Sequence, residues 1–135
     1  VEVYADPDVW MTYGSYRDQD GALGHCEPLP QAAHQPGDYR ARPWVTSHLR
    51  SYRYGLWRRI PQEQLIDPAT GKPWFYATDL AMMFPMLELA REHARFLPDV
   101  LYTYRRHDGN VPAEAYTGPG ERVRAMPRLD RLAHL

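Results

Sequence analysis

The sequence predicts a mixed α/β fold in which a few strands pack with two main helices. Residues 9–16 and 96–106 are rich in β-branched and aromatic types and are typical of strands, the second being interrupted by Pro98. Residues 46–60 and 78–94 have apolar side chains at helical spacing. Two strands are too few for a sheet of their own. We therefore expect them to belong to a sheet whose other strands lie elsewhere.

Composition sets limits on the class of protein. The chain has 135 residues, 44% of them hydrophobic and 24% charged, which is ordinary for one globular domain. A formal net charge of -1 provides no overall attraction to nucleic acid. The single Cys26 fits a reducing compartment, and the longest apolar run, residues 80–87, is too short to span a bilayer. We expect a protein that is cytoplasmic or peripheral to the membrane.

Turns and loops separate the predicted elements. Residues 17–24 contain Asp20-Gly21, a hairpin signal, and residues 67–74, "DPATGKPW", form another turn cluster. Residues 26–43 are rich in Pro, Gln, His and Gly without periodicity, which indicates a long loop.

The predicted helix over residues 46–60 combines arginines with aromatic rings. Its arginines would share one face: Arg50, Arg53, Arg58 and Arg59. Interleaved arginines and rings suit a binding module for phosphorylated or nucleic-acid ligands. The alternative is a helix with an aromatic core face and a solvated arginine face, which the pattern favours, and the net charge disfavours nucleic acid.

The stretch "FYATDLAMMFPMLELARE", residues 75–92, places one acid before an almost wholly apolar run. Such a helix is buried on several sides, and Pro85 should kink it. Asp79 has two interpretations that are compatible with each other. It stabilises a helix N-terminus, or it is a general base at the edge of a site.

The segment "YRRHDGN", residues 104–110, places His107 and Asp108 after the second strand. A histidine at a strand end is a candidate metal ligand, and an exposed loop histidine is the alternative. The remaining histidines show no HxxxH or HExxH spacing, and no P-loop, GxGxxG, GxSxG or CxxC motif is present. Residues 111–135 form a polar loop and a weakly helical tail.

Taken in order, five segments resemble the C-terminal, acceptor-side half of a family 2 glycosyltransferase of GT-A fold. The resemblance covers residues 1–110. Its segments are "VYADPDVWMTYGSY", "SHLRSYRYGLWRRI", "DPATGKPW", "YATDLAMMFPMLELA" and "FLPDVLYTYRRHDGN".

The resemblance implies roles for individual residues. Asp79 matches the Asp of the family's xED motif, the catalytic base that deprotonates the acceptor hydroxyl for inverting transfer, and Thr78 stands where the family has Glu. His107 matches a C-terminal histidine that helps to hold the metal. The remaining candidates would lie near the acceptor or the donor diphosphate: Arg50, Arg53, Tyr54, Trp57 and Trp74.

The resemblance also implies partners. These are a nucleotide-sugar donor, a carbohydrate or lipid-linked acceptor of the kind found in cell envelope polysaccharide, and a divalent metal, Mg or Mn. The metal would be held mostly by a DxD motif that these residues lack, so we expect the isolated chain to have little activity. We also expect self-association or pairing with an N-terminal half. An inactive fragment is the remaining alternative.

Overall fold

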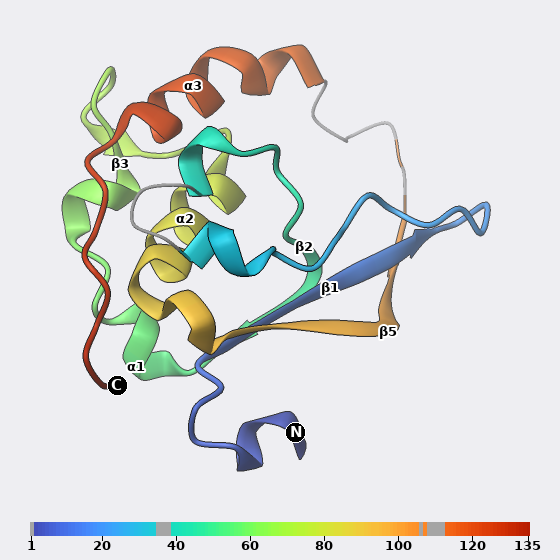
Figure 1. The fold of residues 1–135 in the computed structure, drawn as a ribbon. Helices are drawn as coiled ribbons and strands as arrows, with labels where there is room; N and C mark the ends of the chain where they lie inside the picture. The colour runs from blue at the N-terminus through green and yellow to red at the C-terminus, as the bar shows by residue number, and fades with distance from the viewer. Residues whose placement is uncertain (1, 35–38, 106, 108–112) are drawn as a thin grey trace.

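The computed structural model describes residues 2–34, 39–105, 107 and 113–135. Within them the chain forms a mixed α/β fold with a three-stranded sheet, a small two-stranded hairpin and three α-helices (Figure 1). The strands are β1 (Met11–Asp18), β2 (Ser47–Tyr52), β3 (Ile66–Asp67), β4 (Lys72–Pro73) and β5 (Ala94–Tyr104). The α-helices are α1 (Tyr54–Trp57), α2 (Thr78–Ala90) and α3 (Thr117–Ala125). Short 3-10 helices cover Glu2–Ala5, Gln31–His34, Tyr39–Ala41, Gln62–Leu65, Arg91–His93 and Ala113–Tyr116.

The main sheet has the strand order β2-β1-β5. β1 pairs antiparallel with β2, placing Met11 opposite Tyr52, and parallel with β5, placing Met11 opposite Ala94. β1, the strand predicted over residues 9–16, is therefore the central strand and forms hydrogen bonds with both β2 and β5. The predicted turn at Asp20-Gly21 is also confirmed, since Gly21 has a φ of 89° and its amide donates to the Asp18 carbonyl at 3.0 Å.

β5 is one continuous strand, whereas the sequence predicted two strands separated at Pro98. Its pairing with β1 nevertheless shifts there, because Gly14 faces Leu97 while Tyr16 faces Tyr102. The extra residues bulge from an edge strand, where a proline removes no ladder hydrogen bond. Gly14 permits close strand approach at this point, since a Cβ there would lie 3.3 Å from the Leu97 carbonyl oxygen.

The helix predicted over residues 78–94 is confirmed as α2, followed by the 3-10 turn Arg91–His93. Every residue from Met83 to Ala90 is buried, so the prediction of burial on several sides also holds. α2 continues through Pro85 without interruption. It packs against one face of the sheet, and its other sides meet the loop before β2 and the C-terminal segment (Figure 1).

The helix predicted over residues 46–60 is wrong. Residues 47–52 form β2, and only Tyr54–Trp57 are helical. The side chains of this segment are compatible with the two-residue period of a strand as well as with helical spacing. Backbone hydrogen bonds to β1 favour the strand. The arginines of this segment therefore do not share one helical face.

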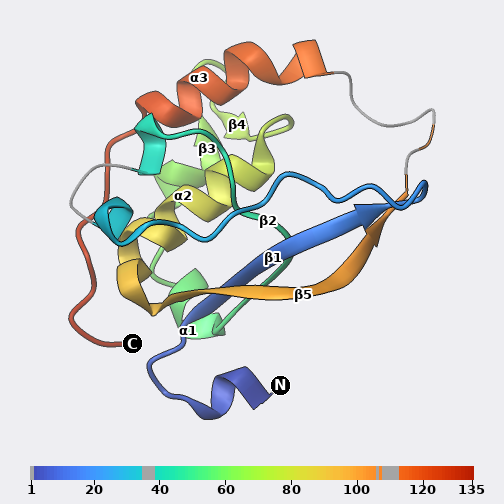
Figure 2. The ribbon, with the colours of Figure 1, turned by 45° about the vertical axis from the view of Figure 1, so that its right-hand side comes forward.

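An outer layer covers α2 on the side away from the sheet (Figure 2). It consists of the β3–β4 hairpin, where the sequence predicted a turn cluster, together with α3 and the C-terminal segment. The predicted tail is helical only up to Ala125. Val123 is nevertheless buried and the Leu132 amide donates to the Leu89 carbonyl at 3.1 Å, so this segment shares the core of α2.

A buried ion pair ties these layers together. Arg40 and Glu88 have side chains that are 1% and 3% exposed, and they pair at 2.5 Å between Nε and Oε1. Arg40 also donates to the Val123 carbonyl at 2.6 Å, and Glu88 accepts from the Leu129 amide at 3.0 Å. One charged pair thus connects the long loop, α2 and the C-terminal segment.

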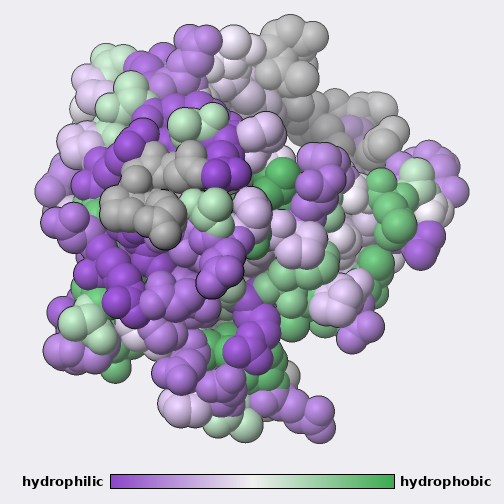
Figure 3. All heavy atoms as spheres, in the orientation of Figure 1, coloured by the Kyte–Doolittle hydropathy of each residue, from purple (hydrophilic) through white to green (hydrophobic). Residues whose placement is uncertain are grey.

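Hydrophilic side chains dominate the face over the helices, while apolar residues appear over the β1 and β5 region (Figure 3). Among the residues that the structure describes, no helix has the length and apolar character needed to cross a membrane.

Candidate functional site

The first turn of α2 and the strand β2 enclose a pocket of about 360 Å³. β2 contributes Arg50 and Tyr52, and α2 contributes Thr78, Asp79, Met82 and Met83. The pocket combines two opposite charges with an apolar floor, which is the usual character of a small-ligand site. The structure therefore brings together three residues that the sequence singled out: Arg50, Thr78 and Asp79.

Asp79 occupies the second position of α2. Its Oδ1 accepts a hydrogen bond from the Leu80 amide at 3.0 Å, and its side chain is 40% exposed. The residue before the helix, Ala77, is buried and has left-handed backbone angles, φ 56° and ψ 26°, with no side-chain cap. Such a conformation is uncommon outside glycine, and it places the start of α2 at the pocket. Asp79 therefore serves the helix N-terminus and faces the pocket as well.

Arg50 approaches Asp79 from β2. Its Nη1 lies 3.8 Å from the Asp79 Oδ2, and its side chain is 17% exposed. Burial lowers the pKa of Arg50, and the charge of Asp79 opposes this shift. The guanidinium remains a cation at neutral pH because an unperturbed Arg pKa is far above that range. It supplies positive charge beside the carboxylate.

His48 holds the other end of this guanidinium. The Arg50 Nη2 donates to the His48 Nε2 at 2.7 Å, which requires His48 to be neutral with its proton on Nδ1. Its ring stacks on Tyr102, with centroids 4.8 Å apart and planes at 18°, and lies near Tyr16 and Tyr104. Burial, followed by the charge of Arg50, lowers the pKa of His48. This cluster thus favours the neutral imidazole.

Tyr116 directly precedes α3 and lies near Asp79. Burial raises its pKa, and the nearby charge of Asp79 raises it further. Its ring also makes an edge contact with Tyr76, at a centroid distance of 6.3 Å. Tyr102 and Tyr116 had no signal in the sequence, because the proximity of Tyr102 to Arg50 and of Tyr116 to Asp79 depends on segments distant in the chain.

Arg53, Tyr54 and Trp57 lie outside the pocket. Arg53 donates to the carbonyl oxygens of Val9, Tyr4 and Asp6, at 2.8, 2.9 and 3.0 Å, and so holds the N-terminal segment. Tyr54 is exposed on α1. Trp57 stacks on Tyr52 with centroids 6.1 Å apart, which makes it a support for a pocket wall.

Trp74 belongs to the core. It is 5% exposed and its Nε1 donates to the Gln64 carbonyl at 3.0 Å. Arg122 covers the ring, with its Cζ 5.9 Å from the centroid. This position leaves little of the ring for a ligand to contact.

His107 is exposed, and Asp108 lies outside the described residues. Among residues 2–34, 39–105, 107 and 113–135, no three His, Cys, Asp or Glu side chains gather as metal ligands. The described residues therefore do not by themselves form a site for a divalent cation.

Comparisons with models of known protein families, with curated proteins and with solved structures found no match to this chain.

Proposed function

We propose that this chain forms the acceptor side of an inverting glycosyltransferase of GT-A fold, with Asp79 as the catalytic base. The order of its segments resembles that half of a family 2 glycosyltransferase. One observation carries the proposal: the Asp79 carboxylate lies at the mouth of a pocket, with the Arg50 guanidinium 3.8 Å away. The residue that the resemblance selects is thus also an acid that lines a cavity.

The reaction fits this arrangement. An Asp79 carboxylate oxygen accepts the proton of an acceptor hydroxyl, and the hydroxyl oxygen bonds to the anomeric carbon of the donor sugar. The bond from that carbon to the diphosphate oxygen breaks, and the nucleoside diphosphate leaves with the electron pair. Attack from the opposite side inverts the anomeric configuration.

Arg50 and His48 act as positioning residues in this proposal. Arg50 attracts the Asp79 carboxylate toward the pocket, and the hydrogen bond that Arg50 donates to His48 fixes the guanidinium. Correct placement of a base relative to the hydroxyl accounts for a large part of enzymatic rate enhancement. Thr78, at the pocket wall, places a hydroxyl where the family has a carboxylate.

The proposed partners follow from the resemblance. They are a nucleotide-sugar donor and a carbohydrate or lipid-linked acceptor used in cell envelope polysaccharide, met in the cytoplasm or at the membrane surface. The resemblance also implies a divalent metal, Mg or Mn, held mostly by a DxD motif that these residues lack.

The test is Asp79→Asn in the complete protein that carries this chain. Donors with UDP, GDP and dTDP are supplied with Mg or Mn and saccharide acceptors, and release of the nucleoside diphosphate is measured. We expect turnover to fall about 10²- to 10⁴-fold, the usual contribution of a general base. Donor binding should persist, because the amide keeps the shape of the side chain.

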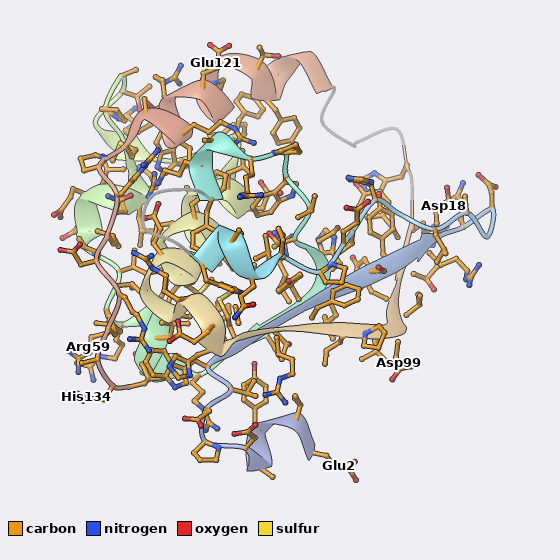
Figure 4. The ribbon with its side chains drawn as sticks, in the orientation of Figure 1. Glu2, Asp18, Arg59, Asp99, Glu121 and His134 are labelled. Carbon is orange, nitrogen blue, oxygen red and sulfur yellow. The ribbon has the colours of Figure 1, made fainter. Side chains whose placement is uncertain are left out.

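Asp99→Asn is the matched control. Asp99 is exposed on β5 and points outward from the strand (Figure 4). The control should transfer sugar at the rate of the unaltered protein. Equal turnover in Asp79→Asn and the unaltered protein would show that Asp79 is not the base.

A further inference from the structure

A second groove, of about 460 Å³, lies between the β3–β4 hairpin and α3. The hairpin side contributes Asp67, Thr70 and Lys72, and α3 contributes Arg122. Phe75 and Tyr76, in the segment that leads to α2, complete the wall. The groove is at least as large as the Asp79 pocket, and the resemblance assigns no role to its lining.

Phe75 gives this groove an unusual surface. Its side chain is 83% exposed, although phenylalanine is normally buried. The ring makes a T-shaped contact with Tyr76 at a centroid distance of 4.9 Å, and most of its surface remains open to solvent. An aromatic face beside hydrogen-bonding groups is suited to a ligand with one apolar and one polar side.

Aromatic rings connect this groove to the Asp79 pocket. Tyr76 contacts Tyr116 at 6.3 Å, and Tyr116 is close enough to Asp79 for that charge to affect its hydroxyl. The chain then runs from Tyr76 through Ala77 directly into the first turn of α2. Phe75, Tyr76 and Tyr116 thus form a series of aromatic contacts from the groove to the neighbourhood of Asp79.

The polar side of the groove is fixed in place. Arg122 makes a bidentate pair with Asp67, at 2.9 Å from Nε to Oδ1 and 2.7 Å from Nη2 to Oδ2. This pair joins α3 to the hairpin, and bidentate geometry restricts both side chains. The Lys72 side chain is exposed, and its ammonium has no partner in the part of the chain that the structure describes. It is available to a ligand oxygen.

We propose that this groove is an acceptor subsite that binds a pyranose ring of an oligosaccharide. A pyranose has an apolar face of C–H groups, which can lie on Phe75, and a rim of hydroxyls, which can reach Lys72 and Thr70. The reacting end of the same oligosaccharide lies in the Asp79 pocket. This inference rests on the proposed function, and it selects acceptors of several sugar units over single sugars.

The experiment is an NMR titration of the chain with three tetrasaccharides: cellotetraose, chitotetraose and tetragalacturonate, each up to about 10 mM, the range of weak binding. At least one should shift the amide signals of residues 70–76 and 116–122. Phe75→Ala should weaken that binding about tenfold, as expected for loss of an aromatic contact. Lys72→Ala should weaken tetragalacturonate most, because that probe carries carboxylates.

Leu23→Ala is the matched control, since Leu23 is a large exposed apolar residue at the turn after β1. It should bind like the unaltered chain. Absence of shifts with all three probes, or equal binding by Phe75→Ala, would overturn the subsite.

The two proposals fail separately. If Asp79→Asn loses transfer but no tetrasaccharide binds at Phe75, the subsite is rejected and Asp79 remains the proposed base. Binding that depends on Phe75, together with full transfer by Asp79→Asn, rejects the base and keeps a saccharide site.

Discussion

At the residue scale, three polar side chains form a line from the sheet to the pocket. His48 accepts a hydrogen bond from Arg50, and Arg50 attracts Asp79. His48 and Arg50 are both partly buried, whereas the Asp79 side chain is 40% exposed at the pocket mouth. The neutral His48 is the anchor, since a protonated imidazole would have no lone pair for the guanidinium.

The hydrogen bond between Arg50 and neutral His48 predicts that the stability of the chain depends on pH. Burial and Arg50 hold the pKa of folded His48 below its ordinary value, with Asp79 opposing the shift. The unfolded chain therefore binds more protons as the pH falls below about 6.5. The free energy of unfolding should be highest above that pH and should decrease between about pH 6.5 and pH 5.

Urea unfolding at several pH values measures this effect. His48→Gln should flatten the decrease, because its side chain does not titrate. Some decrease should remain, since burial also lowers the pKa of His34. The exposed His134 provides the control His134→Gln, with an unchanged profile expected. Equal slopes for His48→Gln and the unaltered chain would contradict the role of His48.

At the element scale, α2 depends on a charged pair that the sequence did not reveal. Arg40 sits in a 3-10 helix of the long loop, forty-eight positions before Glu88. Glu88 lies within an apolar run of the sequence, and its side chain is only 3% exposed. A buried charge is tolerated only when it is paired and hydrogen-bonded, and Arg40 satisfies this requirement.

Glu88→Gln should therefore destabilise the chain by about 3–5 kcal/mol, because it leaves the Arg40 charge buried without its partner. Glu92→Gln is the matched control: Glu92 pairs with Arg131 at the surface, where such pairs contribute about 1 kcal/mol or less. Both values come from urea unfolding. A similar small loss for both variants would show that the buried pair does not hold α2.

At the scale of the whole molecule, the sheet ends on β2 and β5 within the part of the chain that is described. β5 carries an exposed apolar stretch, Val100, Leu101 and Tyr102. An edge strand with exposed apolar side chains is a template for pairing with another chain. Figure 4 shows Asp99 beside this stretch, the kind of charged group that limits such pairing.

We expect the chain to associate with itself as its concentration rises. Light scattering should give an increasing mean mass, and Leu101→Lys should reduce it by placing a charge on the edge. Leu23→Lys, at the turn after β1, provides the control and should associate like the unaltered chain. A monomer at all concentrations would contradict the prediction.

Local signals in the sequence determined much of this fold. The apolar run of residues 80–87 required a buried helix, the aromatic and β-branched residues 9–16 required a strand, and Asp20-Gly21 required a tight turn. Asp79 could be located at the front of its helix for the same reason. Each of these features depends on residues close together in the chain.

Contacts between distant segments decided the rest. Residues 47–52 became a strand because β1 offered hydrogen bonds that a helix would have replaced with its own. This choice directed Arg50 to Asp79 and Arg53 to the N-terminal carbonyls. Contacts with Gln64 and Arg122 hold Trp74 in the core, whereas Phe75 is exposed. Periodicity within one segment contains no information about which partner a side chain meets, so the tertiary structure alone determined the pocket and the groove.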